Sequence, residues 1–382
     1  MNKVDNIRRL WQENCFRWTK IGDQSVIDIV NNARKPVKAS LRCSGSNPYY
    51  GANNIQDFVD GYTHEGEHVL VAEDGSSSLE NYSVQMASGK FWANNHVHVL
   101  RGTEKLNTRF LYYYLCRVNF LPFLTGGGRA KLTKGQLMEI PIPVPCPENT
   151  EMSLSVQAEI VRILDTFNRM SADLSGELAA RKKQLSYYRE KLLNYSNVDL
   201  IPLDQLAVIK AGQPINKNVI SESTGLYPVI NSGREPLGYY SQWNTENDPI
   251  GITSRGAGVG SVTWREGRYF RGNLNYSVSI KEPMVLDVHF LYHILEHLQP
   301  SIRQLCTYDG IPALNAGSLK ELKVPVPALD EQIRVATILD RFDTLANCSQ
   351  EGLPREIELR QKQYAYYRDI LLSVPEFREL TS

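Results

Sequence analysis

The sequence lacks an excess of positive or negative charge: its 42 Lys and Arg residues balance its 42 Asp and Glu residues. This balance excludes a general electrostatic attraction to nucleic acid or to anionic membranes, so any such binding must come from local patches. There is no long apolar run, no signal peptide and no C-x-x-C pair among the six cysteines. We therefore expect a reduced, cytoplasmic protein that contacts no membrane, with each thiol acting as a small buried side chain.

What is present is enough chain for two or more domains: 382 residues, of which 42% are hydrophobic and 22% are charged. The chain repeats itself at offsets of 175 to 182 residues. ILDTF (163–167) returns as ILDRF (338–342), and RKKQLSYYREKLL (181–193) returns as RQKQYAYYRDILL (360–372). Three shorter matches keep the same order: FLYYYL with FLYHIL, LTKGQL with LNAGSL, and PIPVP with VPVP. The pattern indicates a tandem duplication.

Two long helices are predicted, one in each copy. From Gln157 to Tyr195 the apolar residues fall on two interleaved seven-residue series, which is typical of a coiled-coil seam. The second helix, from about Glu331 to Val374, carries four extra residues. Gly352 and Pro354 are among them and predict a kink or a short loop.

We predict an α+β protein with two globular domains separated by two long antiparallel helices, an internal tandem repeat with pseudo-two-fold symmetry. HVLVA (68–72) and IGIT (250–253) are typical of buried strands that end in glycine turns. The expected division is a first head over residues 1–150, a first helix over 151–197, a second head over 198–328 and a second helix over 329–382.

NPYY (47–50) comes within one residue of the Asn-Pro-Pro-Tyr-like loop of enzymes that methylate the amino group of adenine or cytosine. Tyr49 replaces the second proline, however. A cofactor loop also requires glycines after a strand, whereas the glycines of FLTGGGRAK (123–131) follow a helical stretch. These two departures from the methyltransferase pattern indicate that this chain does not catalyse methylation.

Two histidine patterns resemble metal sites. HEGEH (64–68) fits the zincin spacing, but that spacing binds zinc only on a helix, and Gly66 with a following strand predicts a turn. His289, His293 and His297 share one helical face, but no acidic or thiol partner is visible in the sequence. We expect no metal site in either place.

Polar residues occur among glycines and aromatics at matching places of the two heads. Asn, Arg and Lys side chains suit purine edges and phosphates, which predicts DNA contacts, although turn formation is the alternative for each residue alone. The candidates are Tyr50, Asn53, Asn54, Lys90, Asn94, Asn95, Arg129, Lys131 and Lys134 in the first head, and Asn231, Ser232, Arg234, Arg255, Asn273 and Asn275 in the second.

Over nearly its whole length the chain resembles the DNA-specificity subunit of bacterial type I restriction-modification systems. The segments that carry the resemblance are YYGANNIQDFV (49–59), ANNHVHVLR (93–101), GGGRAKLTKGQLMEIPIPVP (126–145) and the duplicated helix. The resemblance implies that each head recognises one half of a bipartite target in double-stranded DNA and that the helices set the spacing. It also implies partners: two modification (methyltransferase) subunits and restriction (motor endonuclease) subunits.

In such an assembly the chemistry belongs to the other chains. The resemblance implies that S-adenosylmethionine, ATP and Mg²⁺ are bound by partner subunits, that adenine is methylated at N6, and that this chain holds no cofactor, no metal and no catalytic residue. Two alternatives stay open from the residues: a methyltransferase that uses Asn47 to Tyr50, and a scaffold with no role in DNA binding.

Overall fold

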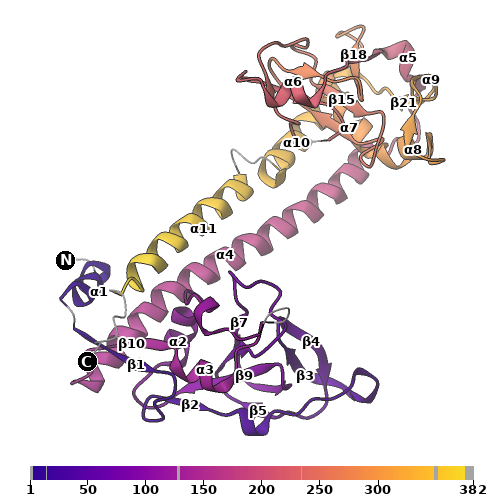
Figure 1. Ribbon diagram of the computed structural model, residues 1–382. Helices are drawn as coiled ribbons and strands as arrows, with labels where there is room; N and C mark the ends of the chain where they lie inside the picture. Colours follow the sequence, from indigo (N-terminus) through magenta and orange to yellow (C-terminus); the bar gives the residue numbers. More distant parts are fainter. Residues whose placement is uncertain (1–2, 14, 127–129, 234, 348–351, 375–382) are drawn as a thin grey trace. The chain divides into compact units, whose positions relative to one another are not determined.

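The structure is a computed structural model that describes residues 3–13, 15–126, 130–233, 235–347 and 352–374. The chain folds as two compact units, Met1–Asp173 with Glu358–Ser382, and Leu174–Ile357. Each unit contains one α+β head and the helical segments against which that head packs (Figure 1). The units are described one at a time.

The first head is built on two four-stranded sheets. One has the order β2-β9-β6-β7, and the other has the order β4-β3-β8-β5, in which β3 and β8 run parallel. A separate pair, β1 with β10, joins the beginning of the head to its end. The elements are α1 (Lys3–Gln12), β1 (Phe16–Lys20), β2 (Ile27–Ile29), β3 (Ser44–Gly51), β4 (Asn54–Val59), β5 (His64–Glu65), β6 (His68–Ala72), β7 (Val84–Ala87), β8 (Lys90–Ala93), β9 (Val97–Gly102), α2 (Thr108–Leu115), α3 (Lys134–Glu139) and β10 (Pro141–Pro145), with 3₁₀ turns at Asn31–Ala33, Ala39–Leu41 and Leu121–Phe123.

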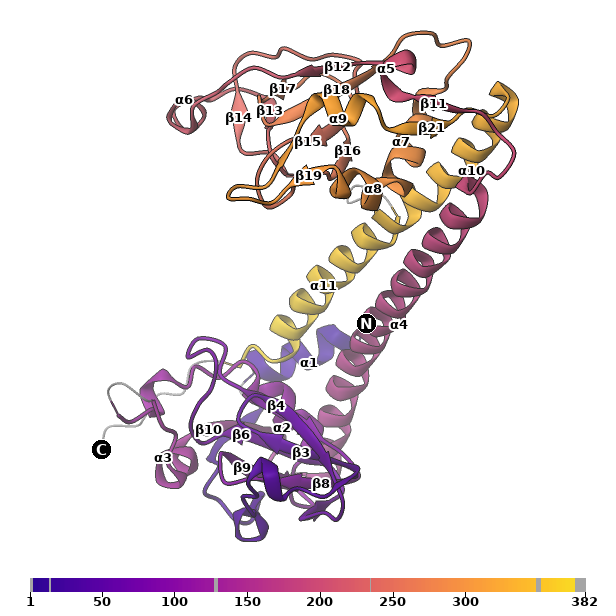
Figure 2. The same cartoon turned by 90° about the vertical axis from the view of Figure 1, so that its right-hand side faces the viewer.

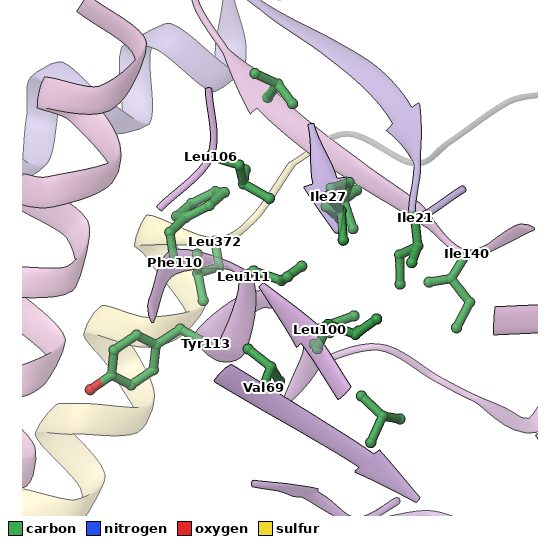
Figure 3. Packing of buried hydrophobic residues seen from close by; sticks show 14 of the residues in the cluster. Ile21, Ile27, Val69, Leu100, Leu106, Phe110, Leu111, Tyr113, Ile140 and Leu372 are labelled. Carbon is green, nitrogen blue, oxygen red and sulfur yellow. The ribbon is translucent and has the colours of Figure 1, made fainter. Parts of the chain in front are cut away.

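The core of this head lies between the β2-β9-β6-β7 sheet and helix α2. Strand β6 is buried at every position, because its sheet is covered on both faces. Helix α2 begins at an Asn107 cap, whose side chain accepts hydrogen bonds from two backbone N–H groups of the first turn. Its apolar side chains Phe110 and Leu111 pack with Val69 and Leu100 of the sheet (Figure 3).

The second head repeats this plan. Its main sheet has the order β12-β18-β15-β16, and a smaller sheet has the order β14-β13-β17 with β13 parallel to β17. The elements are β11 (Leu200–Pro202), α5 (Leu203–Leu206), β12 (Ala207–Ala211), α6 (Lys217–Ser221), β13 (Tyr227–Ile230), β14 (Tyr239–Tyr240), β15 (Ile250–Thr253), β16 (Val262–Trp264), β17 (Phe270–Arg271), β18 (Asn275–Ile280), α7 (Val288–His297), α8 (Gln299–Gln304), β19 (Cys306–Thr307), β20 (Ala313–Leu314), α9 (Ala316–Lys320) and β21 (Lys323–Pro325). The tandem repeat is confirmed at the level of strand order.

The long helices are α4 (Thr150–Leu193), α10 (Leu329–Asn347) and α11 (Gly352–Leu371). In the first unit α4 packs antiparallel to α11, and in the second unit it packs antiparallel to α10 (Figure 2). Ile160, Leu164 and Leu185 of the predicted seam are buried. Pairing of the long helices is therefore confirmed.

Several details differ from expectation. Helix α4 begins seven residues before Gln157, because Thr150 to Val156 continue the helical pattern beyond the seam. The second helical segment is divided into α10 and α11, and Pro354 lies in the first turn of α11, where a proline is tolerated. Cys15, Cys43 and Cys116 are exposed rather than buried, and Cys348 lies outside the described residues. The residue boundaries of heads and helices stay a prediction.

Candidate nucleic-acid interface

In the first head, the main sheet ends in a fixed backbone turn after β6. The N–H of Glu73 donates to the carbonyl of His96 at 2.8 Å, and the carbonyl of Glu73 accepts from the N–H of Leu132 at 2.7 Å. Asp74 comes next, followed by Gly75 with a φ of 71°, a left-handed conformation that favours glycine. The turn therefore fixes where the side chain of Asp74 leaves the head.

In the second head, the same turn follows β15. The N–H of Ser254 donates to the carbonyl of Leu274 at 2.9 Å, and the carbonyl of Ser254 accepts from the N–H of Leu314 at 2.8 Å. Arg255 and Gly256 follow, and Gly256 has a φ of 95°. Both heads thus hold one loop of the same construction, with an acidic residue in the first and a basic residue in the second.

Several predicted residues of the first head gather around this loop. The amide of Asn53 donates to the carbonyl of Gly75 at 2.7 Å, and its oxygen accepts from the N–H of Ser77. The ring of His96 lies 2.5 Å from a carboxylate oxygen of Asp74, as measured from Nδ1. Asn95 is exposed beside His96. The structure therefore joins the β3–β4 turn, the loop after β6 and the loop before β9 into one surface.

Lys131 reaches the same surface through Glu73. Its ammonium group lies 3.1 Å from the Glu73 carboxylate, which also accepts from the guanidinium of Arg34 at 2.7 Å. Burial raises the pKa of the Glu73 carboxyl, but these two donors outweigh burial and hold the pKa below its ordinary value. Glu73 is therefore a charged anchor beneath the loop.

In the second head, predicted residues surround Arg255. The oxygen of Asn231 accepts from the N–H of Leu274 at 3.0 Å, which ties the end of β13 to the loop before β18. Ser232 and Asn273 are exposed. Arg255 is exposed too, and its guanidinium has no acidic partner within the described residues.

Three predicted DNA-contact residues have buried side chains. Tyr50 is 8% exposed and packs edge-on against Phe91, and burial raises the pKa of its hydroxyl. Asn94 is 3% exposed and holds the N–H of His96. Asn275 is fully buried and accepts from a guanidinium. All three side chains pack or form hydrogen bonds inside their heads, where they stabilise the fold.

The remaining candidates lie apart from the loop or outside the described residues. Lys90 begins β8 and places its ammonium group 4.7 Å from the centroid of the Tyr62 ring. Lys134 is exposed at the start of α3, and Asn54 is exposed at the start of β4. Arg129 and Arg234 lie outside the described residues. For Lys90, Lys134 and Asn54 a contact with DNA stays a prediction.

The NPYY segment does not form a methyltransferase loop. It lies in β3, where the amide of Asn47 donates to the carbonyl of Gly61 at 2.9 Å. Tyr49 is 1% exposed, and its hydroxyl accepts from the N–H of Val37. With both tyrosines buried, no aromatic ring of this segment is free to stack on a flipped base.

The histidine patterns also have structural roles. His64 and His68 lie on two strands separated by a turn at Gly66, which confirms the predicted turn. On α7, His293 and His289 both contact Asp340 of α10, at 2.7 and 3.0 Å, an acidic partner that was not visible in the sequence. No cluster of three or more His, Cys, Asp or Glu side chains in the described part of the chain could hold a metal ion.

Sequence reasoning missed Arg271, which is 3% exposed. Its guanidinium donates to the carbonyls of Asp248 and Ile250, to the oxygen of Asn275 and to the hydroxyl of Tyr269. Burial lowers the pKa of this guanidinium. A buried arginine cannot be told from an exposed one by its sequence neighbours alone, because two of its acceptors, the carbonyls of Asp248 and Ile250, lie more than twenty residues away.

The comparisons with known proteins agree with this geometry. The family model of the type I restriction modification DNA specificity domain matches the chain twice, at residues 17–181 and 195–359. The chain is a type I specificity (S) subunit. It is similar to a putative type I restriction enzyme specificity subunit of Haemophilus influenzae, with 44% identity over 96% of this chain and 98% of that one. It is also similar to the EcoR124I/EcoR124II specificity subunit of Escherichia coli, with 34% identity over 98% of each chain.

The fold of an S subunit is shown independently by solved structures. The crystal structure of the type I S subunit from M. genitalium matches with a TM-score of 0.68 and 19% identity, covering 95% of this chain and 97% of that one. As an S subunit, the chain is the non-catalytic specificity component of a type I restriction-modification complex. Family membership thus sets aside both the methyltransferase and the scaffold without a DNA role. Among the described helices, none combines the length and apolar character needed to cross a membrane.

Proposed function

We propose that this S subunit reads a bipartite target in double-stranded DNA, with one head on each half, and directs adenine N6 methylation and restriction by partner subunits. The loop that follows β6 and recurs after β15 carries this proposal. Its backbone hydrogen bonds are the same in both heads, whereas its side chains differ, with Asp74 in one head and Arg255 in the other. A duplicated frame with different side chains fits two half-sites of different sequence.

The long helices fit the role of spacer. Helix α4 runs without interruption for 44 residues, which is about 66 Å at 1.5 Å per residue. Half-sites read from one face of a duplex lie about 34 Å apart or slightly more. A helix of this length therefore suffices to define such a spacing.

The partners we propose are two modification (methyltransferase) subunits, together with restriction (motor endonuclease) subunits. Tyr187 of α4 and Tyr366 of α11 occupy equivalent positions in the repeat and are 58% and 62% exposed. Two equivalent exposed aromatic side chains fit the docking of two copies of one subunit. S-adenosylmethionine, ATP and Mg²⁺ would be bound by these partners in the cytoplasm, and a membrane would take no part.

The proposal is tested by expressing the chain with its modification subunits and sequencing the methylated adenines of the host genome. We expect one split motif, and replacing residues 1–150 by the corresponding part of another S subunit should change only one half of it. Methylation whose sequence ignored this replacement would overturn the proposal. The isolated chain should bind DNA weakly, because its net charge is zero. Salt should weaken this binding further, because basic side chains that contact phosphates release counterions.

A further inference from the structure

Asp74 and Arg255 occupy one position of the duplicated fold. Each follows a residue whose N–H and carbonyl make the two equivalent backbone hydrogen bonds of the loop. Asp74 forms an antiparallel bridge with Lys131, and Arg255 forms one with Ala313. Because the hydrogen bonds of the preceding residue and the antiparallel bridge are equivalent in both heads, the side chains of Asp74 and Arg255 leave their heads from equivalent places.

The two side chains offer opposite hydrogen-bonding chemistry. In Asp74, Oδ1 is held by His96, while Oδ2 has no donor among the described residues; the side chain is 36% exposed. In Arg255, no acceptor within the described residues engages the exposed guanidinium. One position thus presents a fixed acceptor in the first head and a free forked donor in the second.

These groups match the two edges of a G·C pair in the major groove. A guanidinium donates in a forked manner to O6 and N7 of guanine, whereas a carboxylate accepts from the N4 amino group of cytosine. The carboxylate also argues against a contact with the backbone, because phosphates repel it. A base edge is therefore the part of a duplex that Asp74 can contact favourably.

We propose that Asp74 and Arg255 are equivalent specificity-determining residues, each reading one G·C pair of its own half-site: Asp74 through the cytosine and Arg255 through the guanine. This inference rests on the proposed function, since it needs each head to face its half-site with this loop. His96 is then a positioning residue for Asp74, because its ring lies 2.5 Å from Oδ1 of that carboxylate.

The test uses the complete complex of the chain with its modification subunits, on duplexes in which one base pair of the split motif is changed at a time. Arg255→Ala should reduce selectivity at one G·C position of one half-site by about ten- to a hundredfold and leave the other half unchanged. Asp74→Ala, which removes the acceptor, should do the same at one position of the opposite half-site. Competition between duplexes for binding to the complex measures the selectivity even in variants whose methylation rate is reduced.

Arg255→Lys is the matched control for a contact with phosphate. Lysine keeps the charge but loses the fork, so it should not restore selectivity at the G·C position. Unchanged selectivity in Arg255→Ala and Asp74→Ala, or full rescue of the Arg255 position by lysine, would overturn the inference while the split motif itself upheld the proposed function. The absence of any split motif with the parent chain would instead refute the proposed function.

Discussion

The rings of Phe167 and Tyr367 stack in the first unit, with centroids 5.2 Å apart and planes at 22°. In the second unit Phe342 and Tyr188 stack in the same way, at 5.2 Å and 18°. Phe342 is the repeat counterpart of Phe167, and Tyr188 is that of Tyr367. The duplication therefore preserves a helix–helix contact as well as a sequence.

Removing one ring of this contact should affect one unit only. Phe167→Ala should lower the free energy of unfolding of the first unit by about 2 kcal/mol, since it removes a stacked and partly buried ring. Hydrogen exchange read by mass spectrometry follows the two units separately. Phe167→Leu, which keeps most of the apolar volume, is the control and should cost less. Equal loss of protection in both units would contradict the prediction.

The heads are attached to their helices by equivalent carboxylates. In the first unit the hydroxyl of Tyr113, which points toward the helices in Figure 3, donates to Asp165 at 2.6 Å. In the second unit His293 contacts Asp340 at 2.7 Å. Tyr113 and His293 are repeat counterparts, as are the two aspartates. The acceptor has been kept while the donor has changed.

Asp340→Ala should therefore destabilise the second unit by about 1–3 kcal/mol, because the fully buried side chain of His293 loses its acceptor. Asp340→Asn keeps an acceptor oxygen and should cost less. Denaturant unfolding curves of both variants measure the difference. Equal stability of the alanine and asparagine variants would show that the contact with His293 contributes nothing.

Glu73 makes the stability of the first head depend on pH. Its pKa is lowered by Arg34 and Lys131 in the folded state, so the carboxylate stabilises the head above the unfolded-state pKa of about 4.3. This contribution is lost as the pH falls through the lower pKa of the folded state. Glu73→Gln should thus be less stable than the parent by about 1 kcal/mol at pH 7, and this difference should shrink as the pH falls through the folded-state pKa. Unfolding midpoints measured from pH 7 down into the acid range test this, with the exposed Glu80→Gln as control.

Substitution of Arg271 should destabilise the second head more than substitution of most other residues in it. Arg271→Ala leaves several buried acceptors without a donor and should lower the free energy of unfolding by about 3–5 kcal/mol. Arg268→Ala is the control, because Arg268 pairs with Glu246 at the surface and its loss should change stability little. Thermal melts compare the two variants, and similar shifts would refute the assignment of Arg271 as a buried anchor.

Tyr187 and Tyr366 test the number of docked partners. Tyr366→Ala should lower the binding affinity for one of the two modification subunits by about tenfold. The double variant with Tyr187→Ala should lower the affinity for both. Mass photometry of the mixed complex counts the bound copies. Lys182→Ala, exposed about 140° around α4 from Tyr187, should leave both copies bound. Two full copies on the double variant would exclude these tyrosines from the interface.

The sequence by itself determined the duplication, the long helices and the α+β class of the heads. These follow from the order of matched segments and from local periodicity, which require no knowledge of what packs on what. The break near Gly352 and Pro354 was also predictable, because those residues limit the backbone wherever they stand. The turns after HVLVA and IGIT were visible for the same reason.

Only the tertiary structure decided which polar side chains face outward. Tyr50, Asn94 and Asn275 look like loop residues in the sequence but are buried, and Arg271 is held by carbonyls of distant segments. Asp74 and Arg255 became equivalent only once their backbone partners were known. Exposure and pairing depend on segments that are far apart in the chain, so no local pattern could have assigned them.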